Sequence, residues 1–204
     1  MKDLPRTALS VALLAAALLL ACGGDDETTT PDQLPPIAPT SPANVLRNVE
    51  RSFNTKDYDL FEFCLSPNFV FYFNPNDIGE IVEGYVIPVS WNRVEMEAAI
   101  QHMFNEAYRI TLSIPTSGMG TPGSGATTWR AEGVNIRLEL LTSPGNGYRI
   151  GAGFCNFEFE KYENNGAYRW RLTKWWDYTR GLRATTAGLS RAPYSLGSIL
   201  ALYN

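Results

Sequence analysis

The chain has 204 residues, of which 45% are hydrophobic and 12% aromatic, enough apolar side chain for one well-packed domain. Its formal net charge is −4 and its basic residues form no stripe, so the composition gives no support to a nucleic-acid-binding role. The single histidine, His102, and three widely spaced cysteines match no zinc or iron–sulfur pattern. No cofactor or metal is therefore expected, although a metal site built from carboxylates alone stays open.

Residues 1–21 have the features of a signal peptide. Lys2 and Arg6 precede an apolar run over residues 8–21, which is shorter than the roughly 20 residues that a spanning helix needs. The run ends in Leu-Leu-Ala-Cys22, which resembles the lipobox of bacterial lipoproteins, where the cysteine becomes the lipid-modified first residue of the mature chain. The resemblance implies lipidation at Cys22 and attachment to a membrane. The alternative is an ordinary secretory signal that leaves Cys22 as a free thiol.

Residues 22–42 are predicted to be a disordered tether that follows the lipidated cysteine. The stretch is rich in proline, threonine and aspartate and has almost no apolar pattern, so it cannot bury enough surface to order itself. Gly23 follows the cysteine where enteric bacterial lipoproteins retained in the inner membrane carry an aspartate. The resemblance therefore implies the outer membrane of the bacterial cell envelope, with the side of that membrane left open.

Two helices and a strand are expected at the start of the folded domain. Ser41 and Pro42 form a helix start, and four apolar residues then share one face as far as Thr55. Asp57 caps a second short helix that buries Leu60, Phe61 and Cys64. Residues 65–73 follow as a strand that places Phe69, Phe71 and Phe73 on one face.

A long helix is predicted from Asn92, which forms a capping box with Glu95. Its apolar stripe consists of Met96, Ala99, Ile100, Met103, Phe104 and Ala107. His102 lies more than a right angle away from that stripe, so it is expected to be a solvated surface residue rather than a catalytic one.

Two alternating strands follow, over residues 110–114 and 134–140. Gly118, Gly120 and Gly123 between them match G-x-G-x-x-G by count, but Pro122 interrupts the motif and strand residues follow it. A dinucleotide fingerprint must open a helix, so this segment is predicted to be a hairpin connection.

The last strands are predicted to form an aromatic hairpin over residues 153–177, with its turn at Asn165-Gly166. Cys155, Phe157 and Phe159 alternate with polar residues in the first arm. In the second arm the period of two breaks between Leu172 and Trp175, which predicts either a bulge or two adjacent tryptophans on opposite faces. Residues 181–204 read as a tail with a short terminal helix over residues 195–203.

This order of elements resembles the nuclear transport factor 2-like, or SnoaL-like, superfamily. The resemblance covers residues 43–178 and rests on the helix 43–53 with its bend at 54–58, the strand start 65–72, and the closing Trp-x-Leu-x-x-Trp-x-Asp177. It implies an α+β domain over residues 43–180, with a curved antiparallel sheet wrapped round a long helix. A conical pocket is left open at one end of such a domain.

Catalytic members of this superfamily typically place an aspartate or histidine deep in the cone, with a tyrosine, tryptophan or second carboxyl group beside it. Candidate catalytic residues are Asp77, Tyr72 and Asp177, with Glu83, Trp91 and Arg137 also considered. Each has a structural alternative: Asp77 lies in an Asn-Pro-Asn-Asp turn, and Asp177 can cap a turn or pair with Arg180. Ligand-pocket candidates are Tyr72, Trp91, Trp170 and Trp175. A disulfide between Cys64 and Cys155 is left open.

Three functions are compatible with these features. The first is a membrane-anchored, non-catalytic domain that holds a small apolar ligand or serves as an accessory module. The second is an acid–base lyase or isomerase, which predicts a buried carboxylate within reach of a tyrosine or tryptophan donor. The third is a module that forms homodimers through the sheet, which predicts an exposed aromatic patch and a filled cone.

Overall fold

The computed structural model describes residues 35–182 and 194–204. The predicted signal peptide, the lipidation site Cys22 and most of the predicted tether lie outside the described residues. The compact unit that contains the folded domain starts at Pro36.

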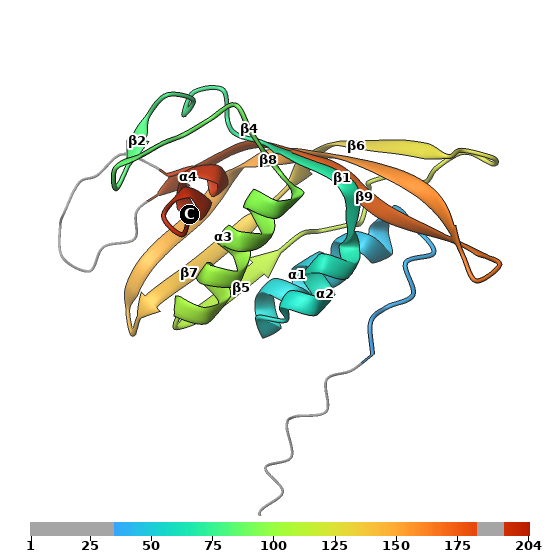
Figure 1. Ribbon diagram of the computed structural model, residues 1–204, viewed down its shortest axis with the longest axis horizontal. Coiled ribbons are helices and arrows are strands. Elements are labelled where there is room, and N and C mark those ends of the chain that lie inside the picture. Colours follow the sequence, from blue (N-terminus) through green and yellow to red (C-terminus); the bar gives the residue numbers. More distant parts are fainter. Residues whose placement is uncertain (1–34, 183–193) are drawn as a thin grey trace, which may run out of the picture. The chain divides into compact units, whose positions relative to one another are not determined.

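The domain consists of four helices and nine strands in the described part of the chain. The helices are α1 (Pro42–Thr55), α2 (Tyr58–Cys64), α3 (Arg93–Glu106) and α4 (Leu196–Ala201). The strands are β1 (Leu65–Tyr72), β2 (Ile81–Val82), β3 (Tyr85–Val86), β4 (Ser90–Asn92), β5 (Arg109–Ser113), β6 (Thr128–Asn135), β7 (Arg137–Ser143), β8 (Asn146–Asn164) and β9 (Ala167–Leu182). Figure 1 shows these elements.

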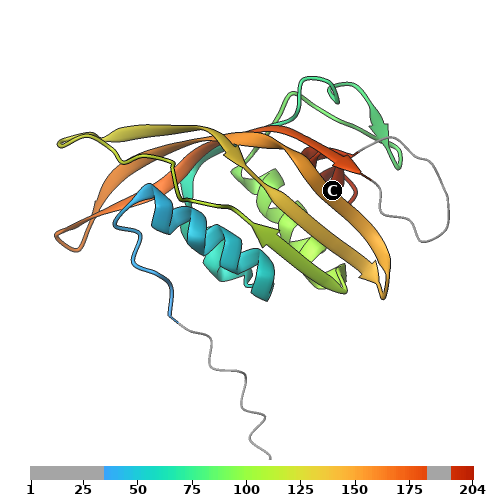
Figure 2. The ribbon, with the colours of Figure 1, turned by 180° about the vertical axis from the view of Figure 1, so that it is seen from behind.

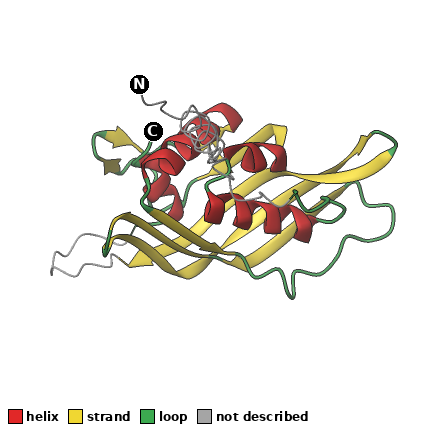
Figure 3. Ribbon diagram, turned by 90° about the horizontal axis from the view of Figure 1, so that it is seen from below, coloured by secondary structure: helices red, strands yellow, loops and turns green. Residues whose placement is uncertain are grey.

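The large sheet has the strand order β4-β1-β9-β8-β7-β5, and β6 pairs with β8 beside this path. The α+β fold class is thereby confirmed. The sheet is mixed, because β1 runs parallel to β9 while the other pairs are antiparallel. All four helices lie against one face of the curved sheet (Figure 3), which is called the inner face, and the opposite side is called the outer face.

The aromatic hairpin is the longest pairing in the sheet and its turn is as predicted. Asn165 and Gly166 have φ values of 51° and 74°, the left-handed pair that a two-residue hairpin turn requires. The second arm contains both features that the break between Leu172 and Trp175 predicted as alternatives, a bulge and two adjacent tryptophans on opposite faces. Lys174 pairs with Glu158 and Leu172 with Phe159, so Thr173 forms a bulge, while Trp175 is buried and Trp176 faces outward. Figure 2 shows the two long arms curving round the helices.

The helix caps are also as predicted. The side chains of Ser41, Asp57 and Asn92 each accept a hydrogen bond from a backbone amide in the first turn of their helix, and Asn92 forms the full capping box with Glu95. The buried face of α3 consists of Met96, Ala99, Ile100, Met103 and Phe104.

The predicted strand over residues 134–140 is in fact two strands. Ile136 separates β6 from β7, and each pairs with a different part of β8. The alternation of apolar residues continues through this corner because Val134, Ile136 and Leu138 all point to the inner face. The alternation of apolar residues therefore did not reveal that the chain changes its pairing partner at Ile136.

The chain is already ordered before α1. The side-chain amide of Asn48 exchanges hydrogen bonds with the backbone N–H and C=O of Ile37, and the Pro39 carbonyl accepts from the Trp170 amide at 2.8 Å. Ile37 and Pro39 lie within residues 22–42, the range predicted to be a disordered tether. No helix in the described ranges is long and apolar enough to cross a membrane.

Candidate functional site

The predicted C-terminal helix is formed, and it occupies the inner face beside the end of β9. Leu196, Ile199 and Leu200 have no exposed surface. The carbonyl of Tyr203 lies 3.0 Å from His102 Nδ1 on α3, so this otherwise exposed histidine contacts the chain end rather than a substrate site. The helix α4 thus covers the inner face of the sheet at this end of β9 and packs beside α3.

Asp177 lies beneath α4 and is completely buried. Its Oδ1 accepts from the Thr179 amide and its Oδ2 from the Gly197 amide, each at 2.8 Å. The hydroxyl of Thr179 accepts from the Leu196 amide at the same distance. A capping arrangement of this kind satisfies the free amides at the start of α4.

Close packing at the start of α4 requires a residue without a side chain. A Cβ atom on Gly197 would lie 2.6 Å from Cδ1 of Phe73 and 3.4 Å from Oδ2 of Asp177. The first turn of α4 therefore rests directly on β9 and the end of β1.

Burial raises the pKa of Asp177 to about 6, against the opposing effect of its hydrogen bonds with Thr179 and Gly197. The thiol of Cys155 is its other neighbour, with 4.0 Å between Sγ and Oδ1. Among the described residues, no tyrosine or tryptophan side chain donates a hydrogen bond to this carboxylate. The buried carboxylate predicted for a lyase or isomerase is present, but its predicted aromatic donor is not.

Asp77 is also attached to α4. Its Oδ2 accepts a hydrogen bond from the Ser198 hydroxyl at 2.9 Å, and its backbone amide closes the predicted turn on the Asn74 carbonyl. The two candidate aspartates, far apart in the sequence, are thus brought to the same helix. Both bind α4 and so hold it in place.

Three of the four ligand-pocket candidates are core residues. Trp91 and Trp175 have no exposed surface and pack against Phe71, and Trp91 donates to the Tyr85 hydroxyl at 2.8 Å. Trp170 is 5% exposed and lies at the far end of β9, where Pro39 covers it. Trp175 Nε1 is the buried side-chain nitrogen that lacks a hydrogen-bond partner in the described part of the chain.

Tyr72 lies on the outer face, away from both aspartates. Its ring stacks on Trp176 with centroids 5.3 Å apart and planes 8° from parallel, and the Arg130 guanidinium lies 4.7 Å from the Trp176 ring. Glu83 is exposed in the turn between β2 and β3, and Arg137 is exposed on β7. None of these candidates joins Asp77 and Asp177.

Cys64 and Cys155 carry free thiols, so the disulfide left open by the sequence is not formed. Cys64 donates to the Leu60 carbonyl of its own helix, and Cys155 faces Asp177 from β8. Burial raises the pKa of each thiol, which leaves both unreactive at neutral pH. Among the described residues, no three His, Cys, Asp or Glu side chains are placed to bind a metal.

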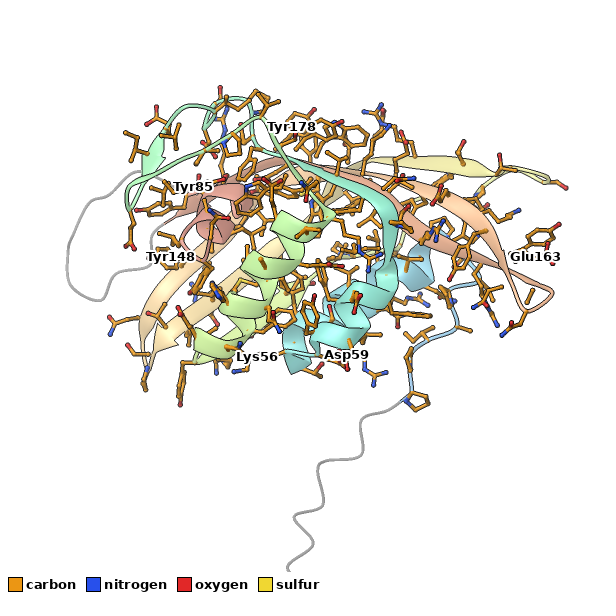
Figure 4. The ribbon with its side chains drawn as sticks, viewed as in Figure 1. Lys56, Asp59, Tyr85, Tyr148, Glu163 and Tyr178 are labelled. Carbon is orange, nitrogen blue, oxygen red and sulfur yellow. The ribbon has the colours of Figure 1, made fainter. Side chains whose placement is uncertain are left out.

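Two cavities open on the outer face, and both are lined by Gly153. The first, of about 420 Å³, is also lined by Ser113, Pro115, Asn135, Ile136, Arg137 and Gly151. The second, of about 350 Å³, is also lined by Asn74, Pro75, Asn76, Phe154, Tyr178 and Arg180. Figure 4 shows Tyr178 on the side of the sheet opposite α3.

The sequence did not reveal the surface that α4 covers, nor that Phe154, Tyr178 and Arg180 line a cavity. The Ser195–Ser198 spacing at the start of α4 is a capping signal, and Ser195 indeed accepts from the Ser198 amide at 3.0 Å. The signal marks a helix but cannot show which surface the helix covers. Phe154, Tyr178 and Arg180 alternate with buried residues, which indicates only that they face outward.

No family model and no curated protein matches the chain. Among solved structures, a conserved protein from Planctomyces limnophilus DSM 3776 has a TM-score of 0.50 and 10% identity, over 68% of this chain and 92% of that one. An NTF2-like protein of unknown function from Shewanella baltica OS155 has a TM-score of 0.39, 12% identity and coverage of 66% and 87%. Delta 5-3-ketosteroid isomerase from Mycobacterium sp. has a TM-score of 0.40, 15% identity and coverage of 69% and 92%. Likeness at these identities concerns the fold and not the activity.

Proposed function

We propose that this chain is a non-catalytic binding or accessory domain, anchored through lipidated Cys22 to the outer membrane of a bacterial cell envelope. In this proposal the domain binds through the outer face of its sheet. The main support for a non-catalytic role comes from Asp177, the one fully buried carboxylate in the described ranges. Both of its oxygens accept hydrogen bonds from backbone amides beneath α4.

A general base must come within hydrogen-bond reach of the proton that it removes. Asp177 is covered by α4, and the two cavities lie on the other side of the sheet. A substrate in the second cavity would meet Tyr178 and Arg180, which alternate with Asp177 and Thr179 along β9. A substrate in the first cavity would meet Arg137 and Asn135. These facts favour binding over acid–base catalysis.

The test for catalysis compares the wild-type chain with Asp177→Asn, each purified in detergent and incubated with a cell-envelope metabolite extract. We expect mass spectrometry to show no metabolite consumed by the wild type. Consumption by the wild type that the folded variant lacks would overturn the non-catalytic assignment.

The anchor is tested separately with Cys22→Ala. Lipid modification adds acyl mass to the mature protein, so we expect the intact mass of the wild type to exceed that of its unmodified sequence and the wild type to fractionate with membranes. The variant should lack the acyl mass. An unmodified wild-type Cys22 would contradict the anchor and leave the binding domain untouched.

Self-association through the outer face is a second candidate. The burial of Trp91 and Trp175 in the core and the stacked pair Tyr72–Trp176, with Phe154 and Tyr178 on the same outer face, favour it. A native mass spectrum of the full chain in detergent that shows a dimer, and a monomer for Trp176→Ala, would support this candidate. A wild-type monomer would remove it.

A further inference from the structure

The two outer-face cavities share Gly153 in their linings and are together called the groove, defined by the lining residues given above. Their volumes of about 420 and 350 Å³ each fall within the range of small-molecule sites, roughly 300–1,000 Å³. The groove crosses β7, β8 and β9 where the pairing of β8 with β9 shifts register between Ile150 and Ala152.

Glycine backbone forms the floor of the groove. Gly153 has φ of +96°, and a Cβ there would lie 2.5 Å from the Tyr178 carbonyl oxygen, so the close approach of β8 to β9 at this position requires glycine. A Cβ on Gly151 would meet nothing within 4 Å. The space above Gly151 is therefore open, and a ligand can approach the backbone closely.

Two arginines line the groove, one in each cavity, and neither has a carboxylate partner in the described part of the chain. Arg137 lines the first cavity and Arg180 the second, and both are exposed. Several other basic residues of the sheet are paired with glutamates: Arg109 and Arg149 with Glu139, Arg130 with Glu132, Arg171 with Glu160 and Lys174 with Glu158. Lys161 and Arg169 also lack a glutamate partner in the described ranges, but they lie beside the hairpin turn at the other end of β8 and β9. At the two cavities the cationic side chains are thus unpaired, in a chain whose net charge is −4.

The lining of the groove also includes aromatic and polar side chains. The rings of Phe154 and Tyr178 lie 5.2 Å apart and 32° from parallel, and Phe154 is 40% exposed. Ser113, Asn76 and Asn135 supply a hydroxyl and amides at the rim. Such a lining can bind a ring-shaped ligand whose apolar face packs on the aromatic side chains and whose hydroxyl groups form hydrogen bonds at its edge.

We propose that this groove binds an acidic glycan, a short chain of sugar rings that carry carboxylate or sulfate groups. Arg137 and Arg180 pair with the acidic groups, and a ring lies against Phe154 and Tyr178. The inference rests on the proposed outer-face function and specifies its ligand.

Competing ligand classes fit the groove less well. A purely apolar molecule would remove two arginines and several amides from water without giving them partners, which costs free energy. A nucleic acid binds through many phosphate contacts along a basic surface, and the neighbouring basic residues of this sheet are already neutralised by glutamates.

The test is calorimetric titration of the full chain, in an uncharged and sugar-free detergent, with tetragalacturonate and with neutral maltotetraose. We expect binding of tetragalacturonate alone, weakening as salt is raised. Arg137→Gln and Arg180→Gln should each weaken binding about tenfold, because each removes a charge-assisted hydrogen bond. Arg130→Gln is the matched control, since Arg130 lies on the same face outside both cavities, and it should leave binding unchanged.

A second pair of variants tests the position of the site. Gly151→Glu places a carboxylate in open space on the groove floor and should abolish binding, whereas Gly151→Ala should retain it. Both should fold, because nothing lies within 4 Å of the added Cβ.

Failure of the acidic-glycan assignment and failure of the proposed non-catalytic function give different experimental results. Absence of tetragalacturonate binding, or equal binding by the two arginine variants and the wild type, would overturn the acidic-glycan assignment. Binding of maltotetraose as tightly as tetragalacturonate would also overturn it. The proposed function fails on a different measurement, the Asp177-dependent consumption of a metabolite.

Discussion

The two sides of β9 are built from alternate residues of one strand but have opposite characters. Asp177 and Thr179 point inward, are fully buried, and bind the backbone amides at the start of α4. Tyr178 and Arg180 point outward and line a cavity, and Arg180 has no partner in the described ranges. Asp177 and Thr179 are thus committed to the fold, whereas Tyr178 and Arg180 remain available to a ligand.

This contrast explains why a buried aspartate with a raised pKa need not be catalytic. Desolvation raises the pKa of Asp177 in the way that suits a general base. The same burial places the carboxylate beneath α4, out of reach of either cavity. Accessibility therefore distinguishes the two roles where the pKa does not.

The largest effect on the free energy of unfolding is expected for Gly197→Val, which disrupts the packing of α4 on the inner face of the sheet. The added atoms would overlap the Phe73 ring and push α4 from the sheet. Loss of the burial of Leu196, Ile199 and Leu200, at about 1.5 kcal/mol or more each, should lower the free energy of unfolding by at least about 4 kcal/mol. Urea denaturation measures it, with Gly151→Ala as a control. A loss below about 1 kcal/mol would show that α4 contributes little.

The next effect is a pH dependence that Asp177 imposes. Its folded-state pKa of about 6 lies above the ordinary value of 3.8, so its stabilising contribution is complete below the unfolded pKa and is lost as pH rises through about 6. Relative to Asp177→Asn, the wild type should lose about 3 kcal/mol between pH 3 and pH 7. Parallel unfolding series at several pH values test this. Identical slopes for the two proteins would contradict the raised pKa.

A smaller effect is expected from Ser198→Ala. The substitution removes the hydrogen bond to Asp77 and the contact with the Ser195 hydroxyl, but it leaves the packing of α4 intact. The free energy of unfolding should fall by about 1 kcal/mol. Hydrogen exchange should quicken in α4 and remain unchanged in α1. Equal acceleration in both helices would mean that α4 does not open independently.

The smallest effect is expected for Arg180→Gln, which sharpens the comparison from the outer side. Arg180 is exposed and unpaired, so its replacement should change the free energy of unfolding by no more than about 0.5 kcal/mol. The same urea series measures it. A loss of 2 kcal/mol would show that Arg180 supports the fold and would weaken its assignment to a ligand.

The regular parts of the fold could be predicted from the sequence because their signals are local. Caps at Ser41, Asp57 and Asn92, the Asn165-Gly166 turn and the alternation of Phe69, Phe71 and Phe73 each depend on a few neighbouring residues. The parallel pairing of β1 with β9 has no such signal, since it joins residues about a hundred positions apart.

The candidate site was harder to predict for the same reason. Asp177 and Asp77 were recognised as candidates, but their role depends on α4, which arrives from the far end of the chain. The groove lies at a register shift between Ile150 and Ala152 that only the pairing of β8 with β9 reveals. Trp91, Trp170 and Trp175 were predicted to line a pocket, and all three are buried in the described structure. Aromatic content alone does not distinguish a packed core from a hollow one.

The bulge at Thr173 decides which of two adjacent indoles faces the core, and this has an optical consequence. Trp175 is enclosed by Phe71 and Phe157, whereas Trp176 is partly open to water between Tyr72 and Arg130. Iodide in solution should reach the emission of Trp176 and not that of Trp175. The chain therefore carries a built-in fluorescent reporter on each side of its sheet, and occupancy of the outer face can be followed without attaching a dye.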